Sequence, residues 1–146
     1  MITVGDLLRM KGSDVWSLAP SASLKETLQF LAEKNVGALL ILDGKEIAGI
    51  ISERDVVRLI AREGTCRLDS PVGEIMTREV ITIKPDQSLQ DAMKLMSREH
   101  FRHLPVVADG NLRGLISIGD VVRAVIEEQS HTINDLEGFI TGSYGQ

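Results

Sequence analysis

The sequence Gly49-Ile50-Ile51-Ser52-Glu53-Arg54-Asp55-Val56-Val57-Arg58 has a second copy, Gly114-Leu115-Ile116-Ser117-Ile118-Gly119-Asp120-Val121-Val122-Arg123. In each copy an apolar run is followed by a Ser, by an Asp three residues later, and by a helical pattern. This order predicts a strand that ends at the Ser and turns directly into a helix. The hydroxyl and the carboxylate then lie at one strand end, which is where α/β proteins bind small molecules.

The duplication extends through most of the chain. With a spacing of 65 residues, Val15 matches Val80 and Leu39 matches Leu104. Further upstream, the segment from Val4 to Leu7 matches the segment from Val72 to Ile75 at a spacing of 68, so the first copy carries three extra residues around Met10 to Ser13. Self-similarity at a fixed spacing indicates a duplicated structural unit.

Hydrophobic periodicity and capping residues predict the same order of elements in both copies. For the first copy we expect a short helix from Thr3 through Met10, a strand at 15–18, a helix capped by Ser23, a hairpin of 37–42 and 46–51 joined at Asp43-Gly44, and a helix capped by Ser52. For the second we expect a short helix at 72–76, a strand at 80–83, a helix from Ser88 toward Glu99, a hairpin of 104–107 and 112–117 joined at Asp109-Gly110, and a helix reaching about Glu128.

The predicted fold class is therefore α/β (α+β), with two strand-helix-strand-strand-helix repeats related by a pseudo-twofold axis. We assign residues 1–64 to the first repeat, 65–130 to the second, and 131–146 to a C-terminal tail. Within the tail, His131 to Ile140 has helical spacing and no counterpart in the first copy, and Gly142 to Gln146 is expected to be a loose end. One repeat alone has too little core to be stable, whereas two can bury their sheets together.

Composition argues against several functional classes. The net charge of −5 and the scarcity of aromatic residues argue against nucleic-acid binding. No apolar run approaches the length of a membrane span, so we expect a soluble, cytoplasmic protein. The three histidines and the single Cys66 lack the close spacing of a metal site, so no metal is expected.

Two alternatives compete with a ligand site at the repeated turn. Ser-x-x-Asp is also a helix capping box, and on local grounds alone capping is the stronger interpretation. An enzyme would need an activated nucleophile or a phosphate-binding loop, and neither motif is present in the sequence. We therefore predict that the protein is not an enzyme, with a cryptic nucleotide hydrolase as the weakest alternative.

Several motifs occur in order and twice, and together they resemble a tandem pair of cystathionine-β-synthase-type (CBS) domains, or Bateman module, of the small stand-alone bacterial type. The resemblance rests on both Gly-Φ-Φ-Ser-x-x-Asp turns, where Φ is an apolar residue, on the segment from Arg102 to Val107, and on the lead-in from Glu74 to Pro85. It covers about residues 1–130. The resemblance implies a regulatory sensor that binds an adenosine-containing ligand (AMP, ADP, ATP, NAD or S-adenosylmethionine) in clefts between the repeats.

The resemblance also implies a role for each site residue. Asp120 and Asp55 would accept the ribose hydroxyls, and Ser117 and Ser52 would lie at the helix start that faces the phosphate. Further ligand contacts would come from the first strand of each copy and from the residues that precede the hairpin strands: Thr82, Arg102 and His103 in the second copy, and Ser17, Gly37 and Ala38 in the first.

The two expected sites differ in charge. Arg102 and His103 offer phosphate partners at the second turn, whereas only Arg54 offers a cation at the first. We therefore expect the Asp120 turn to be the better nucleotide site. The resemblance further implies a homodimer that signals to an unknown regulated partner by a conformational change. A ligand-free interaction or dimerisation module is the alternative.

Overall fold

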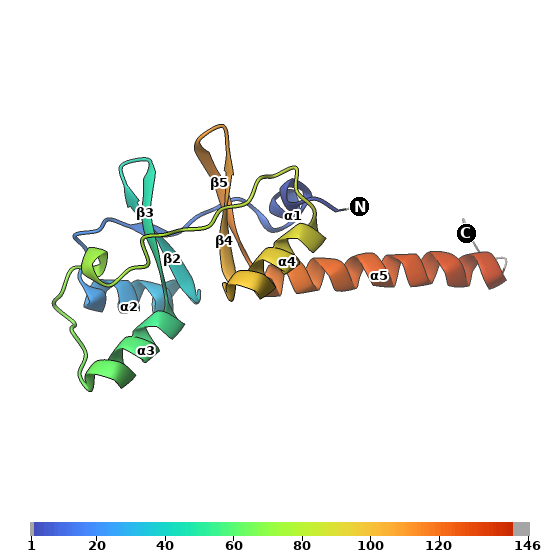
Figure 1. The fold of residues 1–146 in the computed structure, drawn as a ribbon. Helices are drawn as coiled ribbons and strands as arrows, with labels where there is room; N and C mark the ends of the chain where they lie inside the picture. Colours follow the sequence, from blue (N-terminus) through green and yellow to red (C-terminus); the bar gives the residue numbers. More distant parts are fainter. Residues whose placement is uncertain (1, 142–146) are drawn as a thin grey trace. The chain divides into compact units, whose positions relative to one another are not determined.

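The computed structural model describes the backbone of residues 2–141 and the side chains of residues 2–130 (Figure 1). It confirms a mixed α/β fold with two small sheets, ordered β1-β2-β3 and β4-β5. The elements, in chain order, are α1 (Val4–Lys11), β1 (Ser17–Leu18), α2 (Leu24–Lys34), β2 (Ala38–Asp43), β3 (Glu46–Ser52), α3 (Glu53–Glu63), the 3₁₀ helix η1 (Val72–Glu74), α4 (Leu89–Glu99), β4 (His103–Ala108), β5 (Asn111–Ser117) and α5 (Ile118–Thr141).

The chain forms two compact units. The central unit holds Asp14–Ile81, and the terminal unit holds Met1–Ser13 together with Thr82–Gln146. In the central unit, α2, α3 and η1 enclose a core with the β1-β2-β3 sheet, and Leu24, Leu39 and Ile51 are fully buried there. In the terminal unit, α5 contacts α1, α4 and β5. Each unit therefore has its own hydrophobic core.

The segment that leads into each repeat packs in the unit built from the other repeat. These lead-in segments are residues 2–8 and 70–76. Backbone N–H groups of the first segment donate to carbonyls that follow Thr82: Val4 to Gln87 and Gly5 to Pro85, each at 2.8 Å. Matching N–H groups of the second segment donate to carbonyls that precede α2: Val72 to Ala22 at 2.7 Å and Gly73 to Pro20 at 2.9 Å.

Close packing against a glycine fixes the end of each lead-in segment. A Cβ atom at Gly114 would lie 2.7 Å from the Leu8 side chain. One at Gly49 would lie 2.5 Å from the Met76 sulfur and 2.7 Å from the Thr77 carbonyl oxygen. Leu8 and Met76 are related by the spacing of 68. The first glycine of each repeated turn therefore packs against the equivalent residue of a lead-in segment.

The two hairpins share an irregularity and a tight turn. The register shifts between Ile41 and Leu42 in the first hairpin and between Val106 and Val107 in the second, which is the same place in the repeat. In the second hairpin, Asp109 and Gly110 form a two-residue loop with φ of 54° and 76°, as the expected Asp-Gly turn requires. In the first hairpin the expected turn at Asp43-Gly44 is wrong by one residue: Asp43 still pairs with Glu46, so the loop is Gly44-Lys45. Equivalent bulges place the repeated Ser at equivalent strand ends.

The strand expected at 80–83 is not formed. Only Ile83 bridges the sheet, in parallel to Val106, whereas the first repeat has the two-residue strand β1 paired with Leu40 and Ile41. Leu40 matches Pro105 in the second repeat. Proline has no N–H to donate, so the ladder cannot extend back from Ile83 to Thr82.

Other boundaries also differ from the sequence prediction. The short helix expected at 72–76 is the three-residue η1. The helix expected to reach about Glu128 and the separate piece from His131 are one helix, α5, which ends at Thr141. No Gly or Pro lies between Asp120 and Asp135 to interrupt it. The expected loose end at 142–146 lies outside the described residues.

Candidate ligand site

In the part of the chain that the structure describes, four helices begin with the same Ser/Thr-x-x-Asp capping box. In each, the hydroxyl accepts the backbone N–H of the Asp and the carboxylate accepts the backbone N–H of the hydroxyl residue. The four pairs are Thr3 with Asp6, Ser52 with Asp55, Ser88 with Asp91, and Ser117 with Asp120. The capping interpretation is therefore correct at both repeated turns, and capping alone does not distinguish a ligand site.

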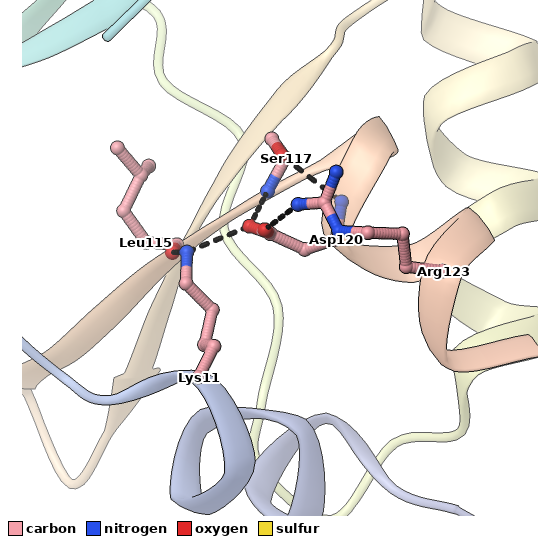
Figure 2. Close-up of polar contacts among 5 residues, drawn as sticks. All are labelled: Lys11, Leu115, Ser117, Asp120 and Arg123. Atoms are coloured by element: carbon pink, nitrogen blue, oxygen red, sulfur yellow. Dashed lines mark hydrogen bonds and ion pairs between the residues drawn. The ribbon is translucent and has the colours of Figure 1, made fainter. Parts of the chain in front are cut away.

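Asp120 differs from the other capping carboxylates because two cations contact it (Figure 2). Its Oδ2 accepts from Lys11 Nζ at 2.6 Å and from the Ser117 backbone N–H at 2.8 Å. Its Oδ1 accepts from an Arg123 guanidinium nitrogen at 2.8 Å. The side chain of Asp120 is only 11% exposed, so these contacts lie in a partly desolvated place.

The contacts of Asp120 change its acidity. Burial by itself raises the pKa of the carboxyl, but the hydrogen bonds from Lys11 and Ser117 and the charge of Lys11 lower it by more, so the pKa lies below its ordinary value. Asp120 is therefore an ionised acceptor at neutral pH. An ionised carboxylate accepts hydrogen bonds from hydroxyl groups through both oxygens.

Asp55 lies at the equivalent turn of the central unit in a simpler environment. Its Oδ2 accepts from the Ser52 backbone N–H at 3.0 Å. Among residues 2–130, no lysine or arginine forms an ion pair with Asp55. Asp55 thus has the same position in its unit as Asp120 but lacks the two cations.

The residues before each hairpin strand lie at the repeated turn. In the terminal unit, His103 pairs with Ser117 in the β4–β5 register, and the Arg102 carbonyl accepts from Ile118 N–H at 2.8 Å. In the central unit, Ala38 pairs with Ser52 and the Gly37 carbonyl accepts from Glu53 N–H at 3.0 Å. The structure thus brings these predicted contacts beside the Ser of each turn.

The structure gives weaker support for the placement of the remaining predicted residues at the repeated turns. Ser17 lies on β1 opposite Leu40, and Arg54 is exposed in the first turn of α3. Thr82 is exposed and lies outside a strand. The prediction that it lies on the first strand of its repeat is therefore wrong, because Pro105 has no backbone N–H to extend the pairing to Thr82. The sequence analysis took the side chain of Arg102 as a phosphate partner, and in the structure that residue is exposed.

Lys11 is the site residue that the sequence analysis missed. Its ammonium donates to the Leu115 carbonyl at 2.8 Å as well as to Asp120, across more than 100 positions of the chain. The three extra residues of the first repeat were the available signal, because they include Lys11 at the end of α1. No local pattern pairs a helix-terminal lysine with one particular distant carboxylate.

A small cavity adjoins this contact. It has a volume of about 180 Å³ and is lined by residues of α1 and of the first part of α5: Leu7, Met10, Lys11, Asp120, Arg123, Ala124 and Glu127. Ligand pockets commonly measure about 300–1,000 Å³, so this cavity holds only part of a nucleotide-sized molecule.

Two further features concern the part of the chain that the structure describes. No group of three His, Cys, Asp or Glu side chains there is placed to hold a metal ion. No helix there combines the length and apolar character needed to cross a bilayer.

Three of the solved structures that are similar to this chain illustrate the relationship. A protein with CBS domains from Burkholderia ambifaria is 40% identical, with a TM-score of 0.83 over 87% of this chain and 96% of that chain. The structure of CBSX2 in complex with AMP is 33% identical, with a TM-score of 0.72 over 88% and 99%. The CBS domain pair of protein MJ0100, in complex with 5′-methylthioadenosine and S-adenosyl-L-methionine, is 25% identical, with a TM-score of 0.76 over 88% and 98%.

The family model of the CBS domain matches this chain twice, at residues 4–62 and 72–127. The two matches follow the internal duplication and include both repeated turns. This chain therefore belongs to the CBS-domain family, as a tandem pair.

Proposed function

We propose that this protein is a regulatory module that binds an adenosine-containing ligand and signals by a conformational change. The observation that carries the proposal is the duplicated strand-to-helix turn with a carboxylate at its helix start, at Asp120 and at Asp55. The carboxylate would accept the two ribose hydroxyls, while the helix N-terminus would favour a nearby anion.

The solved relatives support adenosine as the recognised group. AMP, 5′-methylthioadenosine and S-adenosyl-L-methionine, which are bound in those structures, have adenosine in common and differ beyond it. We therefore propose recognition through the ribose and adenine, with Arg102 and His103 or Arg54 near any phosphate. A sensor of this kind acts by binding one conformation more tightly than another.

The test is calorimetric titration of the protein with AMP, adenosine and S-adenosylmethionine. Asp120→Asn should weaken binding at its site by roughly tenfold or more, because the ribose loses a charged acceptor. Asp91→Asn is the matched control, since Asp91 belongs to the same kind of capping box on α4 and is not a proposed ligand contact. Equal losses in both variants would reduce the role of Asp120 to capping, and the absence of binding to the wild-type protein would reject the proposal.

A second candidate, an interaction or dimerisation module, is favoured by exposed apolar residues on the two helices that follow the turns. On α5, Ile118, Val122 and Ile126 recur every fourth position and are 42%, 43% and 55% exposed. On α3, Val57 is 65% exposed and matches Val122 in the repeat. An apolar stripe on a helix is typical of a surface that another copy covers, and we propose a homodimer.

Native mass spectrometry tests the dimer and the ligand together. We expect a dimer in the wild-type protein and a monomer after Val122→Glu, because the substitution places a charge in the apolar stripe. A wild-type monomer would contradict the dimer. A dimer that binds no adenosine compound would favour the interaction module over the sensor.

A further inference from the structure

We propose that Lys11 is a built-in competitor of the ligand for the Asp120 carboxylate, and that it thereby sets the ligand affinity of this turn relative to the Asp55 turn. The inference rests on the proposed function, since it concerns the same ligand site. The inference adds Lys11 as a residue that regulates the site, and it predicts that the Asp120 and Asp55 turns differ in whether the ligand must displace a cation.

The lone pairs of Asp120 are nearly all in use. Each carboxylate oxygen accepts about two hydrogen bonds. Oδ2 already accepts from Lys11 at 2.6 Å and from the Ser117 backbone at 2.8 Å, whereas Oδ1 accepts from Arg123 at 2.8 Å. A ribose diol donates two hydrogen bonds, one to each oxygen, so one donor must leave Oδ2.

Lys11 is the donor that leaves Oδ2. The N–H of Ser117 belongs to the helix cap and is held by the backbone. The ammonium of Lys11 ends a flexible side chain that is 32% exposed. Arg123 is 71% exposed and contacts Oδ1, which has room for a further donor. Ligand hydroxyls at Asp120 therefore replace the ammonium of Lys11.

The adjoining cavity gives the displaced ammonium a place to go. The cavity of about 180 Å³ lies beside Lys11 and is also lined by Glu127. The carboxylate of Glu127 offers the ammonium a second partner of opposite charge. The exchange thus costs the ion pair with Asp120 and the hydrogen bond to Leu115 but does not bury an unpaired charge.

The central unit provides an internal comparison without a competitor. Ile50 matches Leu115, and its carbonyl accepts from the Thr77 backbone N–H at 2.9 Å instead of from a lysine. Ligand hydroxyls at Asp55 therefore displace no cation, because none of residues 2–130 forms an ion pair with this carboxylate.

The displacement of Lys11 by the ligand would also change the structure away from the carboxylate itself. Lys11 is the last residue of α1, so its release from Asp120 and Leu115 frees the C-terminal end of that helix. Binding and release are thermodynamically linked, so anything that holds Lys11 away from Asp120 would raise ligand affinity.

The experiment is a double-mutant cycle measured by titration calorimetry with adenosine and with AMP. All variants carry Asp55→Asn, so that only the Asp120 site is titrated. Lys11→Met should tighten the binding of both compounds by roughly fivefold, the worth of one partly exposed ion pair. Lys45→Met, on the exposed hairpin of the central unit, is the control and should change neither affinity.

The outcomes separate the inference from the proposed function. In an Asp120→Asn background, Lys11→Met should not change the ligand affinity, because the carboxylate for which Lys11 and the ligand compete is absent. Unchanged affinities after Lys11→Met would overturn the inference while binding itself remained. Weaker AMP binding with unchanged adenosine binding would also overturn it, since Lys11 would then contact the phosphate. If neither the wild-type chain nor the Lys11→Met variant binds, both the inference and the proposed function fail.

Discussion

A single Asp in a capping box acquires its chemistry from what contacts its carboxylate. Asp55, Asp91 and Asp120 all cap helices with the same geometry, but only Asp120 is contacted by both a lysine and an arginine among residues 2–130. An N-cap Ser stabilises its helix by about 1 kcal/mol, whichever of these capping boxes it belongs to. The difference in function between these residues therefore lies in contacts from outside the capping box.

The lowered pKa of Asp120 predicts a pH-dependent contribution to stability. A carboxyl whose pKa is lower in the folded protein than in the unfolded chain stabilises the fold above the ordinary Asp pKa of about 3.9, and the stabilisation is lost as the pH falls through the lowered value. The free energy of unfolding of wild type relative to Asp120→Asn should therefore be larger at about pH 7 than at about pH 2.

Urea unfolding at a series of pH values measures this difference. Asp14→Asn is the control, because Asp14 is exposed and outside the ion-pair cluster. A gap between wild type and Asp120→Asn that stays constant with pH would show that the ion pairs do not stabilise the folded state.

Individual elements follow local sequence where their contacts are local. The caps at Ser52, Ser88 and Ser117 and the Asp109-Gly110 turn form where the sequence predicts them. The first hairpin also forms, but it turns one residue later than expected, because Asp43 pairs with Glu46. The expected strand at 80–83 fails because of a residue in its partner strand, Pro105, which no pattern within 80–83 reveals. Strand prediction depends on the donor groups of the neighbour as well as on the strand itself.

Packing of the lead-in segments predicts unequal effects of two equivalent glycine substitutions. Gly49→Ala should destabilise the protein by about 3 kcal/mol, because the new Cβ meets the Thr77 carbonyl, a backbone atom that cannot move alone. Gly114→Ala should cost only about 1 kcal/mol, because the Cβ meets the movable side chain of Leu8.

Chemical denaturation of the two variants gives the comparison, and Leu8→Ala tests its cause. Combined with Leu8→Ala, Gly114→Ala should become nearly neutral, since the clash is removed. Equal costs for the two glycines, or no coupling to Leu8, would contradict the packing explanation.

At the scale of the whole molecule, the boundaries of the two compact units differ from the boundaries of the two sequence repeats. The lead-in segment of each repeat packs in the unit that contains the other repeat's sheet. Removing the side chain of a lead-in residue should therefore loosen the unit in which that residue packs, whichever repeat supplies it.

Val4 and Val72 form a matched pair for this prediction, since both are fully buried and they are related by the repeat. Val4→Ala should cost about 2 kcal/mol and speed amide hydrogen exchange in β4, β5 and α4. Val72→Ala should cost a similar amount and speed exchange in β2, β3 and α2 instead. The reverse pattern, with Val4→Ala loosening residues 14–81, would contradict the exchanged packing of the lead-in segments.

The sequence by itself determined the duplication, the strand-to-helix turns and their caps, because these depend on contacts within a few residues or on a repeat visible along the chain. Only the tertiary structure decided which unit each lead-in segment joins, that Pro105 prevents pairing at Thr82, and that Lys11 contacts Asp120. Those features join residues more than 20, and in the last case more than 100, positions apart. Contacts of that kind arise from packing, and no local periodicity or capping rule specifies which distant groups meet.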